Sequence, residues 1–383
     1  MPGSSPSPFP ANLPALTSVR FVLALGVVLF HYHLMWIYDD TGTGLFERAR
    51  LGVDVFFILS GFILTHVYRE QIETNRFRYR AFITARFARI YPMHIIMLVF
   101  MLAMVAAASL IGAQFGEGFS PLGFLLSLFM VQSWFPIDAP NNWNGPAWSL
   151  SAEWFAYLAF PLFGWVGLKL KDRPVVLLAL AALAFAGLDA VYRAAFGKIL
   201  PHAEDAMGFL RIVPEFLYGV ALYRLGQRLS PSRLVAVTAA VATVAAFLLA
   251  MHFKVDDRLI VLLAGPLLLT LALLSKARAD GALARPWMLT AGEASFALYM
   301  VHMPVIIAWK GLNAELRGID SSYRMAWPEL TALFALILAL ALVSHFAWET
   351  PVRHWIRRRA ERVWPGVRRQ DLVGAPGSQP PDY

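Results

Sequence analysis

Long apolar segments, separated by short polar connections, recur along most of the chain. A helix needs about 20 mostly apolar residues to cross the hydrocarbon core of a bilayer, and these segments have about that length. The pattern predicts an all-α, polytopic integral membrane protein with about ten transmembrane helices. We place the helices at residues 16–37, 51–67, 91–112, 147–168, 174–194, 209–226, 233–251, 259–275, 288–309 and 327–349.

Composition supports a membrane protein and excludes several other classes. Of the 383 residues, 58% are apolar and 15% are charged, whereas a soluble domain carries about 25% charged residues. This balance excludes a disordered chain, a collagen-like fibre and a disulfide scaffold. The chain has no cysteine, so a thiolate nucleophile and a cysteine metal site are excluded as well. The histidines lack the spacing of metal ligands, and we expect no catalytic metal.

Positive charge predicts the orientation of the chain in the membrane. A further apolar piece at 119–135 is short and is followed by a polar stretch with Gly145-Pro146. If this piece does not cross and the N-terminus is cytoplasmic, most of the 33 Lys and Arg residues lie on the inner side, as the positive-inside rule prefers. We therefore expect both termini on the cytoplasmic side of the membrane and 119–146 as a re-entrant or lid-like outer excursion after the third helix.

Two tails flank the predicted membrane domain. Residues 1–14, rich in proline and serine, are expected to be a disordered N-terminal tail, and residues 370–383 a disordered C-terminal tail. Residues 15–352 are expected to form the ten-helix transmembrane domain. The basic segment 353–369 is expected to lie as a helix on the cytoplasmic membrane surface. The net charge of +8 follows from such segments, and we expect the lipid bilayer and no nucleic acid as a partner.

Ionisable side chains inside predicted spans are costly and indicate function by default. Arg20 and His31 are eleven residues apart on the first span, which places them on one helix face about 16 Å apart along the axis. A snorkelling arginine anchor and a structural histidine are the alternatives for this pair. Asp54 opens the second span, where it could orient an imidazole or simply cap the helix.

Arginines gather at the inner end of the third span. Arg86 and Arg89 are three residues apart on one helix face. Paired guanidinium groups suit a polyphosphate ligand. The alternative is that these arginines only set the membrane topology. This role accounts well for the arginines in residues 76–80, but less well for Arg89, because Arg89 directly adjoins the apolar segment. With Arg20, these side chains form a predicted inner cationic mouth.

Polar groups also gather in the outer half of the predicted bundle. Trp148 and Glu153 lie near the start of the fourth span, and Tyr299 and His302 are three residues apart on the ninth. A buried carboxylate such as Glu153 needs a partner. The predicted outer cluster consists of His31, Asp54, Glu153, Tyr299 and His302. A long phosphate-bearing substrate could enter from the cytoplasm and present its reactive end there.

These motifs resemble those of the membrane-bound acyltransferase family 3, which includes bacterial O-antigen and exopolysaccharide O-acetyltransferases. The resemblance covers about residues 12–360, and five motifs occurring in family order make it specific. They are Arg20 followed after ten residues by His31, the apolar stretch 53–62 around Asp54, Arg86-X-X-Arg89 before Tyr91-Pro92, Trp148-Ser149-Leu150 with Glu153, and Tyr299-X-X-His302 before Pro304.

The resemblance implies a membrane O-acyltransferase that takes an acyl group from cytoplasmic acyl-CoA, usually acetyl-CoA. The acceptor is a hydroxyl of a carbohydrate or glycoside, as in O-acetylation of cell-envelope polysaccharides. It implies that His31 is the catalytic histidine, that Arg86 and Arg89 contact the CoA moiety, and that Glu153 and His302 support the site. We expect His31, Glu153 and Asp54 to be catalytic and Arg20, Arg86, Arg89, Tyr299, His302 and Trp148 to bind the substrates.

The expected chemistry fits these residues. A histidine, with an ordinary pKa of about 6.5, can take the proton of a sugar hydroxyl as it attacks a thioester. Asp54 or Glu153 could fix the imidazole tautomer, as the third group does in hydrolase triads. An acyl-enzyme on Ser60, Ser149 or Ser151, or on a histidine, is the covalent alternative to direct transfer.

Two other functions are compatible with charged groups in a membrane. A secondary transporter of a polar solute also uses them, but such transporters often carry inverted repeats, and none is visible in this sequence. A non-catalytic partner in polysaccharide assembly is the second alternative.

Overall fold

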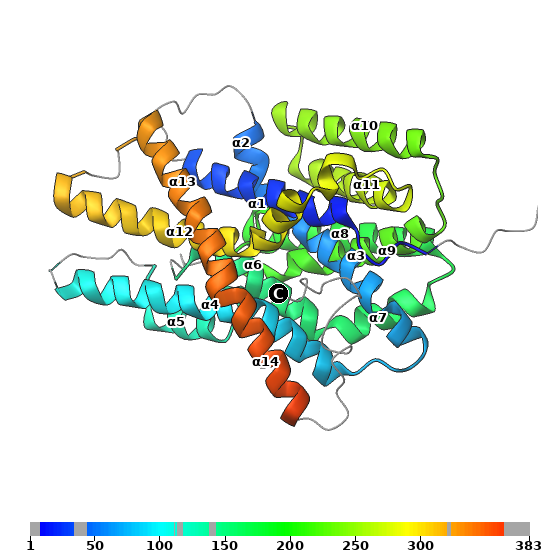
Figure 1. Cartoon of the computed structure of the whole chain (residues 1–383), viewed down its shortest axis with the longest axis horizontal. Helices are drawn as coiled ribbons and strands as arrows, with labels where there is room; N and C mark the ends of the chain where they lie inside the picture. The colour runs from blue at the N-terminus through cyan, green and yellow to red at the C-terminus, as the bar shows by residue number, and fades with distance from the viewer. Residues whose placement is uncertain are drawn as a thin grey trace, which may run out of the picture.

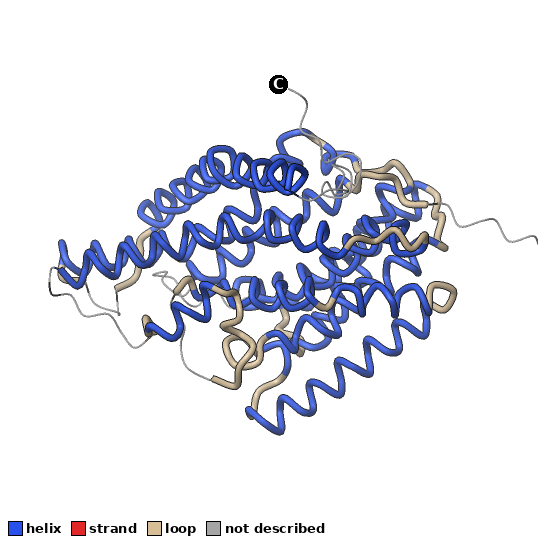
Figure 2. The backbone as a smooth tube through the Cα atoms, turned by 90° about the horizontal axis from the view of Figure 1, so that it is seen from below, coloured by secondary structure: helices blue, strands red, loops and turns tan. Residues whose placement is uncertain are grey.

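The computed structural model describes residues 8–33, 44–110, 112, 118–137, 143–319 and 323–363. These described residues form helices joined by loops, with no strand among them (Figure 2). The predicted all-α class is confirmed. The predicted tail 370–383 and the end of the predicted basic helix, 364–369, lie outside the described residues.

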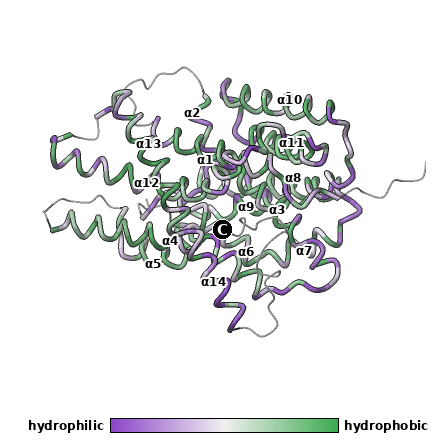
Figure 3. Tube along the Cα trace, viewed as in Figure 1, coloured by the Kyte–Doolittle hydropathy of each residue, from purple (hydrophilic) through white to green (hydrophobic). Residues whose placement is uncertain are grey.

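Eight helical segments of the described chain are long and apolar enough to cross a membrane. Figure 3 shows apolar residues along most of them. The long helices are α1 (Pro14–His33), α3 (Gly52–Glu73), α4 (Tyr79–Leu110), α8 (Pro174–Phe196), α10 (Arg233–His252), α11 (Asp257–Lys276), α12 (Pro286–Arg317) and α13 (Trp327–Ser344). Each of six segments is a single long helix. In the other two segments, shorter helices adjoin the long helix, before α3 and after α13.

The other two predicted spans are helical but differ from simple spans, so the number ten is not confirmed. The predicted span 147–168 is divided at Ala159 into α6 (Trp148–Leu158) and α7 (Phe160–Lys169). Pro161 lacks the N–H that would continue the first helix, which explains the division. The predicted span 209–226 is α9 (Phe209–Gln227), which carries buried Arg and Glu side chains.

Among its described residues, the segment between α4 and α6 contains one short α-helix and a 3₁₀ turn. Ser120 caps α5 (Pro121–Leu128) by accepting a hydrogen bond from Gly123 N at 3.0 Å. Eight residues extend about 12 Å, which is too short to cross a bilayer. A 3₁₀ turn, η2 (Gly145–Ala147), then leads into α6. Entry of this segment from the outer side stays a prediction, and residues 138–142 lie outside the described ones.

Small residues let the central helices approach one another. A Cβ atom on Gly61 of α3 would lie 2.1 Å from the carbonyl oxygen of Phe216 in α9. A Cβ on Gly219 of α9 would lie 2.0 Å from Ile58 O in α3. Close backbone contact of this kind is typical of helix packing in membranes. It holds α3 and α9 in direct backbone contact.

The last helices form one continuous rod that crosses the molecule obliquely (Figure 1). After α13, a π-helical turn, η5 (His345–Glu349), leads directly into α14 (Thr350–Val363). Pro351 lies in the first turn of α14, directly after the wider π turn, where its missing N–H does not interrupt the helix. The side chains of Ala81 in α4 and Ala360 in α14 pack together, so α14 lies along α4, and its residues are largely hydrophilic (Figure 3).

Part of the N-terminal tail is ordered. Phe9 is buried, with its ring 5.6 Å from the ring of Phe62 in α3 and 5.6 Å from that of Tyr223 in α9. The predicted disorder of residues 1–14 is therefore wrong from residue 8 onward, because an aromatic anchor outweighs the local proline content. Residues 1–7 lie outside the described residues.

Candidate functional site

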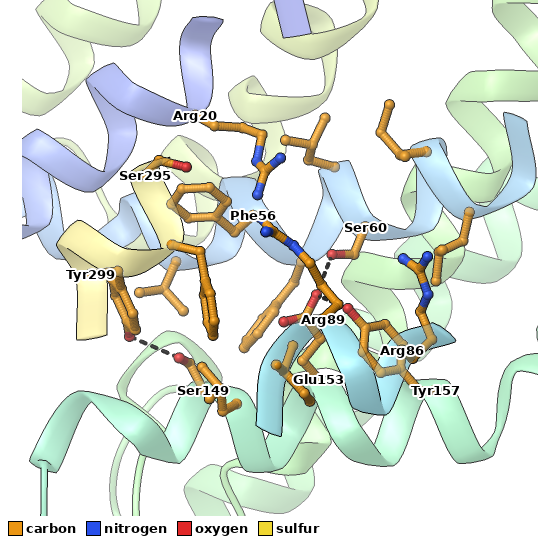
Figure 4. A pocket seen from close by; sticks show the side chains of 18 residues that line it. Arg20, Phe56, Ser60, Arg86, Arg89, Ser149, Glu153, Tyr157, Ser295 and Tyr299 are labelled. Atoms are coloured by element: carbon orange, nitrogen blue, oxygen red, sulfur yellow. Dashed lines mark hydrogen bonds between the residues drawn. The ribbon is translucent and has the colours of Figure 1, made fainter. Parts of the chain in front are cut away.

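A cavity of about 170 Å³ lies between α1, α3, α4, α6 and α12. Figure 4 shows the side chains that line it. Its three arginines are Arg20 from α1 and the pair Arg86 and Arg89 from α4. The sequence predicted these residues to lie together, and the structure brings them into one cavity. In Figure 4 the guanidinium groups of Arg20 and Arg89 point toward one another.

Glu153 lies in this arginine-lined cavity and not beside His31. Its Oε1 accepts hydrogen bonds from Ser60 Oγ at 2.9 Å and from the Tyr157 hydroxyl at 2.6 Å. The predicted placement of Glu153 in the outer cluster is therefore wrong. Glu153 lies more than one helical turn after Trp148 on α6. This distance along the helix brings its side chain into the arginine-lined cavity.

A buried carboxylate on the π turn holds Arg89. Arg89 Nη1 forms an ion pair with Oε1 of Glu349, whose side chain is fully buried. His345 Nδ1 lies 3.0 Å from the other carboxylate oxygen, Oε2. The guanidinium group of Arg89 also lies 5.3 Å from the ring of Phe296. Arg89 is thus held in place by α12 and by the α13–α14 rod.

Helix α14 brings two further arginines to the same place, and the sequence analysis missed them. Arg353 Nη1 lies 3.5 Å from Glu349 Oε1, the oxygen that also binds Arg89. Because α4 and α14 run in opposite directions, Arg357, one turn further along, faces the turn of α4 that carries Arg86. The Nε atoms of Arg86, Arg353 and Arg357 are buried and have no hydrogen-bond partner among the described residues. The spacing of Glu349, Arg353 and Arg357, four residues apart on one face, was the available signal.

A second cavity, of about 210 Å³, lies next to the first. His31, Arg50, Trp148, Glu204 and Asp205 line it. The side chains of Val53 and Tyr299 line both cavities. Arg20 and His31 are eleven residues apart on α1, so the arginine-lined cavity and the histidine are about 16 Å apart along that helix.

A histidine pair defines the proton positions in the second cavity. His302 Nδ1 lies 2.6 Å from the carbonyl oxygen of Tyr299, so this nitrogen must donate. His31 Nδ1 lies 2.9 Å from Val27 O and 3.2 Å from His302 Nε2. A carbonyl oxygen only accepts, so Nδ1 of His31 also carries a hydrogen atom. Neutral His31 therefore has its lone pair on Nε2, the nitrogen that a general base needs.

The predicted contact between Asp54 and His31 is wrong. Asp54 is fully buried and binds Arg211 of α9 through two hydrogen bonds, one of them 2.7 Å between Nε and Oδ1. The guanidinium group of Arg211 lies 5.1 Å from the ring of Trp148. A buried carboxylate takes the best available cation, and this cation lies on a helix far away in sequence. Asp54 therefore supports the wall of the second cavity through Arg211 and Trp148.

Tyr299 lies where the two cavities meet. Its hydroxyl donates to Pro146 O at 2.8 Å and lies 2.8 Å from Ser149 Oγ (Figure 4). His302, one turn further along α12, is fully buried. The motif Tyr299-X-X-His302 thus provides one residue to the junction and one to the histidine pair, as their shared helix face predicted.

Comparison with known proteins finds acyltransferases. A family model described as an acyltransferase domain matches residues 13–346. The chain is 30% identical to acyltransferase MdmB of Streptomyces mycarofaciens, over 91% of this chain and 93% of that protein. It is also 26% identical to a putative O-acetyltransferase of Staphylococcus aureus, over 39% of this chain and 24% of that protein. No solved structure matches the chain.

These matches agree with the motifs and with the helical architecture. The family model covers most of the chain, and the Streptomyces relative aligns over nearly its whole length. The described helices include eight that are long and apolar enough to cross a membrane. The chain is thus a multi-pass membrane O-acyltransferase that belongs to the membrane-bound acyltransferase family 3.

Proposed function

We propose that this O-acyltransferase moves an acyl group, most simply acetyl, from acyl-CoA to a hydroxyl of a carbohydrate or glycoside. The observation that carries the proposal is the pair of adjoining cavities, one lined by arginines and the other containing a histidine with its Nε2 lone pair. The first cavity suits the charged end of an acyl donor. The second suits the transfer reaction, because His31 lies there.

The charge around the first cavity favours a polyphosphate. Glu153 and Glu349 lie among the arginines there, and both are already bonded to protein groups. The five guanidinium groups leave an excess of positive charge that an anionic ligand would neutralise. The arginines are Arg20, Arg86, Arg89, Arg353 and Arg357. CoA carries its phosphates at one end of a long arm, and its thioester at the other.

The length of α1 explains why a long donor is needed. The separation of about 16 Å between Arg20 and His31 along the helix axis is greater than a side chain can bridge. An extended pantetheine arm could pass between Val53 and Tyr299, which line both cavities. The phosphates would then stay in the cationic cavity while the thioester lies beside His31.

The proposed reaction is a direct transfer. Nε2 of His31 takes the proton of the acceptor hydroxyl, and the hydroxyl oxygen attacks the thioester carbonyl carbon. The carbon–sulfur bond then breaks, and the leaving CoA sulfur receives the proton from His31. His302 Nε2 accepts the hydrogen bond from His31 Nδ1 and holds the ring, a role that a carboxylate has in hydrolase triads.

The serine alternatives have other partners. Ser60 Oγ donates to Glu153, and Ser149 Oγ lies between Pro146 O and the Tyr299 hydroxyl. Ser151 Oγ accepts from the backbone N–H of Ser133 at 3.2 Å. None of the three is hydrogen-bonded to a histidine in the described part of the chain. This supports direct transfer over an acyl-serine intermediate.

The site also favours an enzyme over a transporter, and the test separates the two. Protein in lipid nanodiscs is incubated with acetyl-CoA and a panel of methyl glycosides, and free CoA thiol is measured. The chain has no cysteine, so the protein adds no thiol background. We expect glycoside-dependent CoA release and a product heavier by one acetyl group. Glycoside uptake into proteoliposomes without CoA release would support the transporter and overturn the proposal.

The orientation in the membrane belongs to the same proposal. We propose that the protein lies in a bacterial inner membrane with both termini and the arginine-lined cavity on the cytoplasmic side, where acyl-CoA is made. The acceptor would then meet His31 from the outer half of the bilayer.

A further inference from the structure

We propose that Asn144 is a positioning residue, which holds the turn of α12 interrupted by Pro304 and so keeps His302 in place beside His31. This inference rests on the proposed acyl transfer and adds a residue that acts through others. Asn144 is buried, and it is not one of the described residues that line the two cavities. Its effect on the reaction must therefore pass through the helix that it contacts.

Pro304 lies inside α12 and leaves one backbone carbonyl of that helix without its usual partner. In an α-helix a carbonyl oxygen accepts a hydrogen bond from the N–H four residues further along, and proline has no N–H. The carbonyl concerned is that of Met300, which is fully buried. A buried carbonyl without a hydrogen bond destabilises the fold. Met300 O therefore needs a donor from outside the helix.

The side-chain amide of Asn144 supplies this donor. Its Nδ2 donates to Met300 O at 3.1 Å. The carbonyl oxygen only accepts, so the amide nitrogen and not the amide oxygen must face it. Asn144 directly precedes η2 and has a left-handed backbone, with φ 67° and ψ 73°, a conformation that asparagine adopts more readily than most residues. Asparagine thus meets the requirement of the backbone and that of the hydrogen bond.

The same turn is bonded to α12 a second time. Pro146 O accepts a hydrogen bond from the Tyr299 hydroxyl at 2.8 Å. Tyr299 and Met300 are successive residues, so the segment 144–146 holds two neighbouring positions of α12. Gly145 and Pro146 themselves line the second cavity. The η2 turn and this part of α12 therefore form one connected wall of the cavity that contains His31.

The turn of α12 that is held in this way carries His302. The Nδ1 atom of His302 lies 2.6 Å from Tyr299 O, and its Nε2 lies 3.2 Å from His31 Nδ1. Both distances depend on the position of the α12 backbone, which its own hydrogen bonds hold less firmly beside a proline. A displacement of about 1 Å at a reacting group can lower a rate by about 10²-fold. Loss of the Asn144 amide should therefore slow the transfer and leave the donor site intact.

The variants separate the amide from the backbone. Asn144→Gly removes the amide, and glycine adopts the left-handed conformation without steric cost. The control is Asn75→Gly, because Asn75 is an exposed asparagine that also has a positive φ, 54°. Pro304→Ala restores an N–H that can bind Met300 O within α12, so Asn144→Gly is also made in that background as a double-mutant cycle.

Purified proteins in lipid nanodiscs receive acetyl-CoA and a methyl glycoside that the wild type acetylates. The kcat is calculated per acetyl-CoA site, and these sites are counted by calorimetry. We expect Asn144→Gly to lower kcat about ten- to hundredfold, while the Kd for acetyl-CoA changes less than about twofold. In the Pro304→Ala background the same change should lower kcat less than about threefold, because Met300 O then has a partner in its own helix. Asn75→Gly should behave as the wild type does.

The melting temperature gives a second measurement of the cycle, which remains possible if Pro304→Ala lowers the activity. Asn144→Gly should lower the melting temperature in the wild-type background and lower it less in the Pro304→Ala background. Wild-type kcat in Asn144→Gly would overturn the inference, and so would losses of kcat and melting temperature that are equal in both backgrounds. A loss of acetyl-CoA affinity as large as the loss of kcat would also overturn it, since a general packing defect reaches both cavities.

The acyl transfer itself stands in these three cases. A wild type that releases CoA with no glycoside overturns the proposed function, and this inference falls with it.

Discussion

The arginines of α14 provide the sharpest test of the donor site. The change is Arg357→Gln, which removes the charge and keeps most of the side-chain length. Arg358→Gln is the matched control because Arg358 is the next residue on the same helix and is exposed, whereas Arg357 is half-buried and its Nε is fully enclosed. Both changes remove one positive charge from α14, so a general electrostatic effect would be equal in the two proteins.

The size of the effect follows from the contact. A hydrogen bond to a charged group contributes about 1.5–3 kcal/mol. Arg357 is partly exposed, so we expect the lower part of that range, about 1.5–2 kcal/mol. This corresponds to a roughly ten- to thirtyfold increase in the Kd for acetyl-CoA. Arg358→Gln should change that Kd by less than about threefold, because an exposed charge is screened.

Arg357→Gln should not lower the stability of the ligand-free protein, although it weakens acetyl-CoA binding. In the free protein, the guanidinium group of Arg357 faces the turn that carries Arg86, and like charges repel. Removal of one of them should leave the melting temperature unchanged or raise it. A structural arginine would behave differently, because its loss would lower the melting temperature. Weaker binding without lower stability is thus the expected signature of a ligand-binding residue.

The assay uses two donors that share the acetyl-pantetheine part and differ in the phosphorylated nucleotide. Binding of acetyl-CoA is measured by calorimetry in nanodiscs, and transfer is measured with acetyl-CoA and with S-acetyl-pantetheine, which lacks the nucleotide. Arg357→Gln should raise the KM for acetyl-CoA and leave that for S-acetyl-pantetheine unchanged. An equal loss with both donors, or the same loss in Arg358→Gln, would refute the assignment of α14 to the donor site.

Three further predictions test the reaction, the packing and the topology. His31→Ala should lower the transfer rate by a factor of about 10²–10⁴ and leave acyl-CoA binding within a few-fold. His33→Ala should keep most activity because His33 stacks on Phe46 at 5.6 Å; a dead His33 variant would contradict the assignment. Asp54→Asn should lower the free energy of unfolding by about 3–5 kcal/mol, since it removes the charge that neutralises buried Arg211; an unchanged melting temperature would argue against that ion pair. Single cysteines in place of Gly118 and Gly197 should react with an impermeant thiol reagent from outside, and those in place of Lys171, Arg228 and Arg278 should not; outside labelling at 171 would reverse the predicted topology of the segment after α4.

The fold could be predicted from the sequence mainly where one physical effect dominates. Runs of apolar residues placed the long helices, because only a helix satisfies its own backbone in a membrane. Boundaries were less predictable where helices extend beyond the apolar run. Helix α4 begins at Tyr79, twelve residues before the predicted span, and so includes both Arg86 and Arg89. Phe9 was missed because one aromatic ring in a proline-rich tail gives no periodic signal.

The site was predicted best where two residues share one helix face. Such pairs line the cavities or contact a residue that does, and they are Arg20 with His31, Arg86 with Arg89, and Tyr299 with His302. Contacts between helices were predicted poorly. The partners of Asp54 and Arg89 lie on α9 and on the π turn after α13, more than 150 residues away.

The errors at Asp54 and Glu153 have one physical cause. Helix rise converts residue number into depth, and on depth alone both carboxylates were expected beside His31. Depth is only one coordinate, and the direction of each side chain depends on which helices pack beside its own. Asp54 faces α9, where Arg211 neutralises it, and Glu153 faces α3, where Ser60 donates to it. With both acids engaged elsewhere, the group that remains beside His31 is a second histidine, His302. An uncharged orienting group stabilises a protonated His31 less than a carboxylate would, so the proton taken from the acceptor is more readily passed on to the leaving sulfur.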